Sequence, residues 1–322
     1  MDRKGIVKPI HFYYKEKPIY KYILLKKVNM KIIGGIMRKG LILKVLMSLF
    51  IVSLIGCTDG KESNNIVSTE INGVIEIDYF DVGQGDSALI QVNGKSMLID
   101  AGTNDTEDKL VQMIKDEGIK KLDYVIGTYP HEDHIGGLDK VIDNFEVGEI
   151  IMPEVKNTTK TFESVLKSAA KKEKKIKKAK PGIEIDLGEG TNVEVFSPGK
   201  DKYKELNNYS LIMKITYGEN SFLFTGDAEK EVEKEVINNG YNLKSDVIKV
   251  GHHGSTTSTT EEFLELVNPE IAVISVEKEN TYGHPEKKIL DRLKNKNIKI
   301  LRTDEIGSIE VISDGKNISI NN

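Results

Sequence analysis

Five of the six histidines in this chain lie in three short clusters. Imidazole is the commonest protein ligand for metal ions, and its ordinary pKa lies close to neutrality. Histidines confined to glycine-containing loops, with an aspartate inside one cluster, therefore predict a metal-binding or acid–base site, whereas any one of them alone would be an ordinary surface or core residue. The three clusters are Pro130-His131-Glu132-Asp133-His134, Gly251-His252-His253-Gly254-Ser255 and Tyr282-Gly283-His284-Pro285.

The first cluster has the spacing of a ligand set. His131 and His134 are three residues apart with Asp133 between them, in a stretch that we expect to be a tight loop entering a helix. Neighbouring side chains in such a loop can converge on one or two cations. The Gly136-Gly137 pair that follows permits a tight turn and a close backbone approach.

Asp100 and Asp227 each stand at the end of an apolar segment that is predicted to be a strand. A carboxylate at the end of a buried strand must be paired or bind a metal, because the desolvation of an unpaired charge is costly. Asp227 is the better candidate for a metal ligand. Asp100 is either a ligand or the group that holds a histidine N–H.

The elements that must position these residues alternate between strand and helix patterns from Val74 onward, with no clear break. Each histidine cluster follows a predicted strand or lies just beyond one, and loops at strand ends on a rigid sheet are where functional groups usually lie. The second half repeats the order of the first, which predicts one domain of two similar halves in the α/β (α+β) class. The predicted strands cover residues 74–80, 88–92, 96–100, 122–127, 211–217, 221–225, 246–250 and 271–276, and the predicted helices cover 110–117, 138–145, 161–175 and 229–238.

The single cysteine, Cys57, excludes a disulfide framework and a zinc site built on several thiolates. It follows a basic start at Met37, a largely apolar run over residues 41–55 and the tripeptide Leu54-Ile55-Gly56. This pattern resembles a bacterial lipoprotein signal, which implies cleavage before Cys57 and lipid attachment to its sulfur. The alternative is a transmembrane anchor, for which the apolar run is short against the roughly 20 residues of a span.

We therefore predict a leader over residues 1–56, a polar tether over 57–73 and a globular domain over 74–322, with Met37 or Met30 as the true start. The domain would be extracytoplasmic, anchored to the outer face of the cell membrane, and its partner would be the membrane through lipidated Cys57.

The charge of the domain limits its partners. Residues 1–56 hold 12 of the chain's 46 Lys and Arg and 2 of its 50 Asp and Glu, so the remainder has a formal charge of about −14. An acidic body repels polyanions in general. The lysine-rich stretch Lys167–Lys180 runs the other way, and it is either a contact for nucleic acid or another polyanion, or a solvated helix face and loop.

Six short motifs, taken in order, resemble the metallo-β-lactamase superfamily, and within it the extracellular hydrolase domain of ComEC-type competence (DNA-uptake) proteins. The resemblance spans about residues 74–315 and implies a four-layer αββα sandwich with a metal site at one edge between two sheets. The motifs are Phe80–Ser87, Leu98–Gly102, His131–Gly137, Thr225–Ala228, Lys249–Ser255 and Tyr282–Pro285.

This chain departs from the family's usual His-x-His-x-Asp-His pattern, because Tyr129 stands at the first position. A further family histidine is also missing, and the corresponding region holds only Asn207-Asn208-Tyr209-Ser210. The resemblance therefore leaves an incomplete ligand set for one metal and a complete set for the other, so that one or two divalent ions, zinc or manganese, are expected. The incomplete set is His131 and Asp227, and the complete set is Asp133, His134, His252 and Asp227.

The implied chemistry is hydrolysis by a metal-activated water. Asp133 would orient that water or take its proton, and His284 would donate to the developing negative charge, with Lys249 or Ser255 as weaker candidates. Tyr129 would ligate weakly, donate a hydrogen bond or fill the space of the missing histidine, and no nucleotide cofactor is expected. The residues assigned to shaping the site or contacting substrate are Asp81, Gln84, Asp86, Asp100, Tyr129, His253 and Ser255.

Three functions are compatible with this site. The leading hypothesis is a surface-anchored phosphodiesterase or nuclease-like hydrolase. The first alternative is a lipoprotein of impaired activity that binds a polymer or a protein partner. The second is a hydrolase of a small ester, lactone or lactam, since fold-level likeness alone does not determine the substrate.

Overall fold

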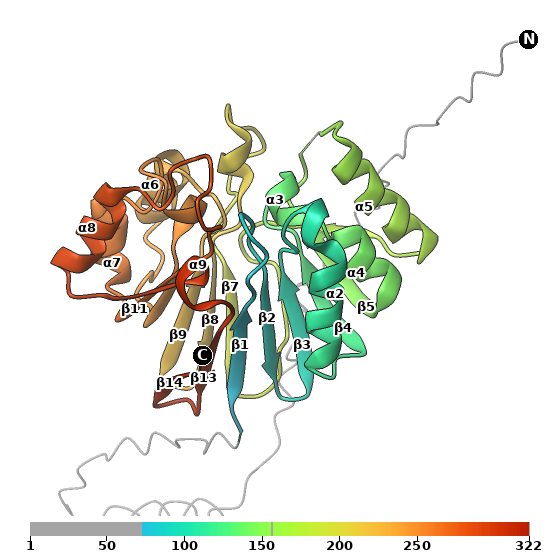
Figure 1. The fold of residues 1–322 in the computed structure, drawn as a ribbon, viewed down its shortest axis with the longest axis horizontal. Helices are drawn as coiled ribbons and strands as arrows, with labels where there is room; N and C mark the ends of the chain where they lie inside the picture. Colours follow the sequence, from blue (N-terminus) through green and yellow to red (C-terminus); the bar gives the residue numbers. More distant parts are fainter. Residues whose placement is uncertain (1–72, 156, 322) are drawn as a thin grey trace, which may run out of the picture. The chain divides into compact units, whose positions relative to one another are not determined.

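Two mixed β-sheets form the centre of the fold (Figure 1). The computed structural model describes residues 73–155 and 157–321. The first sheet has the strand order β14 (Ile318–Asn321), β13 (Ile309–Ser313), β1 (Ile75–Tyr79), β2 (Ala88–Val92), β3 (Lys95–Ile99), β4 (Lys121–Ile126), β5 (Glu146–Met152) and β6 (Ile176–Lys178). The second has the order β12 (Lys299–Arg302), β11 (Ile271–Ile274), β10 (Val247–Lys249), β9 (Asn220–Phe224), β8 (Met213–Tyr217) and β7 (Thr191–Val195).

Both sheets combine an antiparallel part with a parallel part. Strands β1, β2 and β3 pair antiparallel, and β3, β4, β5 and β6 pair parallel. The second sheet repeats this arrangement, with β7, β8 and β9 antiparallel and β9, β10, β11 and β12 parallel. The repetition confirms the similarity of the two halves that the sequence predicts.

Helices cover the outer faces of the two sheets, with α2, α4 and α5 on one side and α6, α7 and α8 on the other (Figure 1). The α-helices are α2 (Glu107–Asp116), α3 (Glu132–Ile135), α4 (Leu138–Asn144), α5 (Lys160–Lys171), α6 (Lys230–Asn238), α7 (Glu261–Val267), α8 (Lys287–Asn295) and α9 (Thr303–Ile306). Short 3₁₀ turns lie at η2 (Asn104–Thr106), η3 (Leu206–Tyr209) and η4 (Gly251–Gly254).

Alternation of side chains along the strands divides the apolar residues among three cores. In β3, Met97 and Ile99 join the core between the sheets, whereas Leu98 joins the core beneath α2 and α4. In β9, Phe222 and Phe224 face the first sheet and Leu223 faces the helices α6 and α7. Three cores separating four layers confirm the predicted αββα sandwich.

The predicted elements are confirmed with small shifts of their ends. The helix expected over 161–175 ends at Lys171, because Glu173 has a left-handed φ of 56° that the helix cannot accommodate. Cys57, the leader and the tether lie outside the described residues, and the predicted division of the chain stays a prediction. Within residues 73–155 and 157–321, no helix is both long and apolar enough to cross a membrane.

The parallel strands bring the motifs together. The carboxyl ends of β4, β9, β10 and β11 lead into the loops that carry Tyr129–His134, Asp227, His252–His253 and His284. Neighbouring parallel strands end at the same edge of a sheet, and the two sheets pack face to face. The fold therefore gathers residues more than 100 positions apart into one group of loops.

Candidate metal centre

Four side chains converge at this edge: Asp133, His134, Asp227 and His253, whose ligand atoms all lie within 4.8 Å of one another. Asp133 and His134 come from α3, Asp227 follows β9, and His253 follows β10. Two nitrogen and two carboxylate oxygen donors form a set that suits a borderline divalent cation.

The distances within this cluster leave two buried atoms that a cation would satisfy. His134 Nε2 lies 3.2 Å from Asp227 Oδ1, and His253 Nε2 lies 3.2 Å from Asp133 Oδ2. Among the described residues, His134 Nε2 and Asp227 Oδ1 are buried and make no hydrogen bond of good geometry, so that they face one another only as an ion pair. Buried polar atoms in native proteins are almost always paired, so these two indicate a missing ligand partner. The residues present therefore fit a metal ion.

Asp100 lies behind His134 and not in the cluster's centre. The His134 Nδ1 is 2.7 Å from Asp100 Oδ2, and Thr128 donates to the same carboxylate from its backbone N–H at 2.7 Å and its hydroxyl at 2.6 Å. Three donors orient this carboxylate, while burial raises its pKa. Asp100 thereby holds the Nδ1–H tautomer of His134 and directs Nε2 at the metal position.

His253 is held in the same way from the second sheet. Its Nδ1 donates to the Ser275 carbonyl at 2.9 Å, and the carboxylate of Asp86 lies 3.3 Å from that nitrogen. Lys249 pairs with Asp86 at 2.8 Å, and all three side chains are buried. The sequence offered Lys249 as a weaker candidate for donating to the substrate's negative charge. In the structure, Lys249 instead pairs with Asp86.

His252 and Tyr129 face the other oxygen of Asp227. The Tyr129 hydroxyl donates to Asp227 Oδ2 at 2.5 Å, and His252 Nε2 lies 3.6 Å from the same oxygen. The sequence reading placed His252 among the metal ligands and left His253 open. In the structure His253 belongs to the four-residue cluster, and His252 stands beside it.

The backbone of η4 decides which of these adjacent histidines turns inward. His252 and His253 have left-handed φ values of 52° and 53°. Such a conformation costs a non-glycine residue about 1–3 kcal/mol, and it persists where the surroundings over-determine it. The strained pair directs the two imidazoles to opposite oxygens of one carboxylate.

Three members of the cluster, Asp133, Asp227 and His253, line a cavity of about 610 Å³. His131 stands on its wall with its ring 4.6 Å from that of Tyr129, and His284 stands on another wall, 5.6 Å from the ring of His252. Burial lowers the pKa of His131 and of His284. Both imidazoles are therefore neutral near pH 7.

Three of the predicted site-shaping residues lie further out. Gln84 accepts a hydrogen bond from the Glu277 backbone at 3.2 Å and ties two loops of the cavity wall together. Asp81 caps the backbone of its own loop at Gly83. Ser255 lies 3.1 Å from the Thr257 hydroxyl, which in turn lies 3.0 Å from His252 Nδ1, so it supports His252 from behind.

The carboxylates and imidazoles shift one another's protonation. Burial lowers the pKa of His134, but the carboxylates of Asp227, Asp100 and Asp133 outweigh it and raise that pKa well above its usual value. Burial likewise opposes the charged form of His253, yet Asp227 and Asp86 raise its pKa to about 10. Without a cation, both imidazoles are therefore protonated on both ring nitrogens and positively charged at neutral pH.

Sequence reasoning assigned no role to Thr128, Ser275 or Tyr282. Thr128 and Ser275 orient ligands through a carboxylate or a backbone carbonyl, and no residue type marks such contacts in a sequence. Tyr282 lines the cavity and stacks on His284. Its place directly before Gly283-His284 was the signal that could have identified it.

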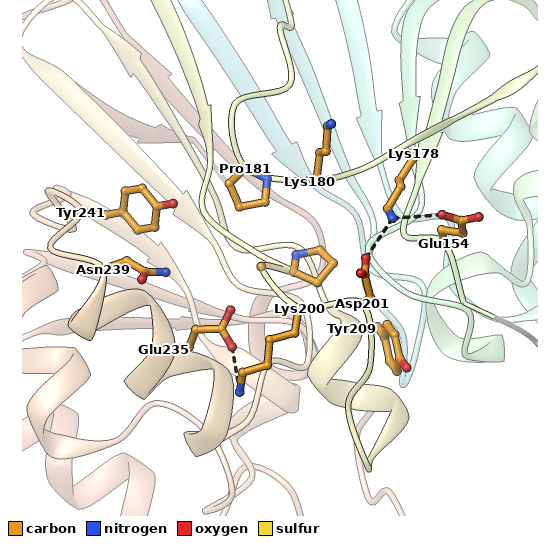
Figure 2. A pocket seen from close by; sticks show the side chains of 12 residues that line it. Glu154, Lys178, Lys180, Pro181, Lys200, Asp201, Tyr209, Glu235, Asn239 and Tyr241 are labelled. Carbon is orange, nitrogen blue, oxygen red and sulfur yellow. Dashed lines mark hydrogen bonds and ion pairs between the residues drawn. The ribbon is translucent and has the colours of Figure 1, made fainter. Parts of the chain in front are cut away.

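A second cavity, of about 700 Å³, lies on the lysine-rich side of the domain (Figure 2). Lys178 reaches Glu154 at 3.0 Å and Asp201 at 3.3 Å, and Lys200 reaches Glu235 at 3.1 Å. These ion pairs neutralise much of the positive charge at this cavity. A polyanion contact through Lys167–Lys180 stays a prediction.

Comparison with known proteins places this geometry in context. A family model described as the metallo-beta-lactamase superfamily matches residues 80–277. ComE operon protein 3 of Bacillus subtilis is 34% identical over 253 residues, which cover 73% of this chain and 32% of that protein. Competence protein ComA of Neisseria gonorrhoeae is 28% identical over 236 residues, with 73% and 32% covered. The chain thus spans about a third of the length of these relatives.

Among solved structures, the metallo-beta-lactamase fold protein YhfI of Bacillus subtilis superposes with a TM-score of 0.50 at 12% identity, covering 77% of this chain and 100% of that chain. At that identity the likeness concerns the fold alone. Together with the competence-type relatives, these matches confirm the resemblance that the six motifs predict.

Proposed function

Because the chain belongs to the metallo-β-lactamase superfamily of hydrolases, we propose that it is a metal-dependent phosphodiesterase. The observation that carries the proposal is the convergence of Asp133, His134, Asp227 and His253 beside an open cavity that three of them line. Two imidazoles and two carboxylates that converge in this way are a donor set that binds divalent cations.

The proposed centre holds one cation tightly, zinc or manganese. Asp227 would bind it through Oδ1, because Oδ2 already accepts the Tyr129 hydroxyl at 2.5 Å. Burial and the neighbouring Asp227 carboxylate raise the pKa of Tyr129 well above its usual value, so the hydroxyl keeps its proton and remains a donor. A second cation beside His131 and His252 would have to displace that bond.

When bound, the cation would supply a water of lowered pKa and polarise a substrate oxygen. Asp133 is the least buried member of the cluster and lines the cavity, so its carboxylate is placed to orient that water and accept its proton. His284 is neutral near pH 7 and faces the same cavity, so its N–H is placed to donate to the substrate's developing negative charge.

The choice of phosphodiesters is supported by the resemblance to the hydrolase domain of DNA-uptake proteins and by relatives named for competence. A further relative is Recombination protein 2 of Haemophilus influenzae, 30% identical with 73% of this chain and 28% of that protein covered. We further propose that the domain is anchored outside the cell membrane by lipid on Cys57, on the strength of the signal-like sequence before it.

Elemental analysis combined with a hydrolysis assay tests the proposal. The chain carrying Cys57→Ser, purified with zinc or manganese, should hold about one equivalent of metal and hydrolyse bis(4-nitrophenyl) phosphate. Asp227→Ala should lose metal and hydrolysis together. Asp105→Ala, which removes an exposed carboxylate, should lose neither.

If the metal-loaded chain hydrolyses a lactone or lactam but no phosphodiester, the proposed substrate class is wrong and the second alternative is favoured. A purified chain that takes up no metal would contradict the enzyme itself and favour a binding protein.

A further inference from the structure

The rim of the metal-site cavity carries an exposed aromatic ring. Of the large apolar side chains exposed in the described part of the chain, Tyr282 is the most exposed, at 70%, and it is the one aromatic. It lies in the loop between β11 and α8 and lines the same cavity as Asp133 and His253. A single exposed apolar side chain is ordinary on a protein surface, but one that also lines the cavity of a candidate site is placed to contact a ligand.

One face of this ring is already occupied and the other is free. Tyr282 stacks on His284 with ring centroids 5.8 Å apart and an interplanar angle of 21°. Near-parallel packing against His284 fixes the plane of the tyrosine ring, while its high exposure leaves the opposite face open. A flat, oriented and open aromatic face suits a second planar ring.

Hydrogen bonds of the Asn280 side chain hold the loop that carries Tyr282 in one conformation, which fixes the position of the ring. Asn280 accepts hydrogen bonds from the backbone N–H groups of Tyr282 and His284 at 3.1 and 3.0 Å. Its amide donates to the carbonyls of Glu277 and His284 at 2.9 and 2.6 Å. Four hydrogen bonds from one side chain close the loop, and an ordered aromatic loses little entropy when it binds.

The ring and the metal centre line the same cavity and are connected by two further rings. From Tyr282 the rings of His284 and His252 follow at steps of 5.8 and 5.6 Å, and His252 Nε2 is 3.6 Å from Asp227 Oδ2. A planar group on Tyr282 and an attached phosphate at the metal position beside Asp227 would therefore both lie within this cavity.

The charges on the rim limit the length of such a ligand. Glu132 and Glu277 line the cavity, and the domain as a whole is acidic. Additional phosphates extending past the rim would meet like charge. A cavity of about 610 Å³ suits one or two nucleotide units rather than a duplex.

We infer that Tyr282 is the stacking platform for a nucleobase, and that the substrates are short or single-stranded nucleotide phosphodiesters with a base next to the scissile phosphate. The inference rests on the proposed function and narrows its substrate class. Base stacking on aromatic side chains tolerates any base, so discrimination is expected between a base and no base rather than among bases.

The test compares two single-stranded oligonucleotides, one complete and one with abasic residues, on the metal-loaded full chain carrying Cys57→Ser. Wild type should prefer the complete strand. Tyr282→Ala should raise KM for it about tenfold or more with kcat little changed, and the preference over the abasic strand should disappear. Tyr282→Phe keeps the ring and should retain the preference. Leu266→Ala, an exposed apolar residue on α7, is the matched surface control.

Fluorescence of an oligonucleotide containing 2-aminopurine gives a readout independent of turnover. Wild type and Tyr282→Phe should quench it, and Tyr282→Ala should not. Equal hydrolysis of the complete and abasic strands by wild type, or quenching by the Tyr282→Ala variant, would contradict the stacking inference. Neither result would contradict the proposed phosphodiesterase activity. Quenching by wild type without hydrolysis of either strand overturns the phosphodiesterase and leaves the nucleobase platform standing.

Discussion

Replacing Tyr129 by phenylalanine tests the most unusual contact of this site. The Tyr129 hydroxyl is fully buried, and it donates to Asp227 Oδ2 at 2.5 Å across 98 positions of sequence. Tyr129→Phe keeps the ring and its packing and removes only that donor. The carboxylate oxygen then retains His252 Nε2 at 3.6 Å as its near polar neighbour.

The expected cost follows from the charge and burial of the acceptor. A hydrogen bond to a charged group contributes about 1.5–3 kcal/mol to stability. For a domain of this size, each kcal/mol shifts the Tm by roughly 2–4 °C. The metal-free variant should therefore unfold about 3–12 °C below wild type. Since Oδ2 is freed, Tyr129→His, which adds a nitrogen donor there, should raise the bound metal from about one equivalent toward two.

Differential scanning calorimetry with and without chelator measures the first effect, and elemental mass spectrometry measures the second. Tyr79→Phe is the matched control, because the Tyr79 hydroxyl is equally buried but has no hydrogen-bond partner among the described residues. That change should leave the Tm unchanged or raise it. If Tyr129→Phe behaves like Tyr79→Phe, the hydrogen bond does not stabilise the site, and the account of a single tight cation loses its basis.

Three further predictions concern charge in the same site. Carboxylates raise the pKa of His253 to about 10 and that of His134 well above its usual value, so metal binding at neutral pH must displace a proton from each imidazole. The apparent affinity for metal should therefore rise as the pH is raised above neutrality. Titration calorimetry in two buffers of different ionisation enthalpy would show the proton release, and an affinity that does not change with pH would contradict it. The same shifts stabilise the metal-free fold below about pH 6.5, the unfolded value, and this stabilisation should fade as pH rises toward about 10, which chemical denaturation with chelator would measure. Lys249→Met removes the lysine partner of the buried Asp86 carboxylate and leaves His253, 3.3 Å away, as its charged neighbour. The variant should lose up to about 3–5 kcal/mol of stability in urea unfolding, and adding Asp86→Asn should recover part of that loss. Equal stability of the single and double variants would show that the ion pair is not what the substitution breaks.

The amino-acid sequence by itself determined the strand and helix segments and the residue types of the site, and the family resemblance of its motifs implied the four layers. Strands read as apolar runs because they are buried on both faces or on one, and helices read as periodic stripes, since both patterns follow from local geometry. The aspartates and histidines stood out because they end strands or sit in glycine-bearing loops. All of these signals lie within a few residues of one another in the chain.

Only the tertiary structure decided how those residues divide the work. His252 and His253 are adjacent and identical in type, and their roles separate through two left-handed backbone conformations and the position of the Ser275 carbonyl. From the sequence, Tyr129 was a weak ligand, a hydrogen-bond donor or a filler of the missing histidine's space, with the filler favoured, whereas in the structure its hydroxyl donates to Asp227. Such choices depend on distances between segments that are far apart in sequence, and packing of the two sheets is what sets those distances.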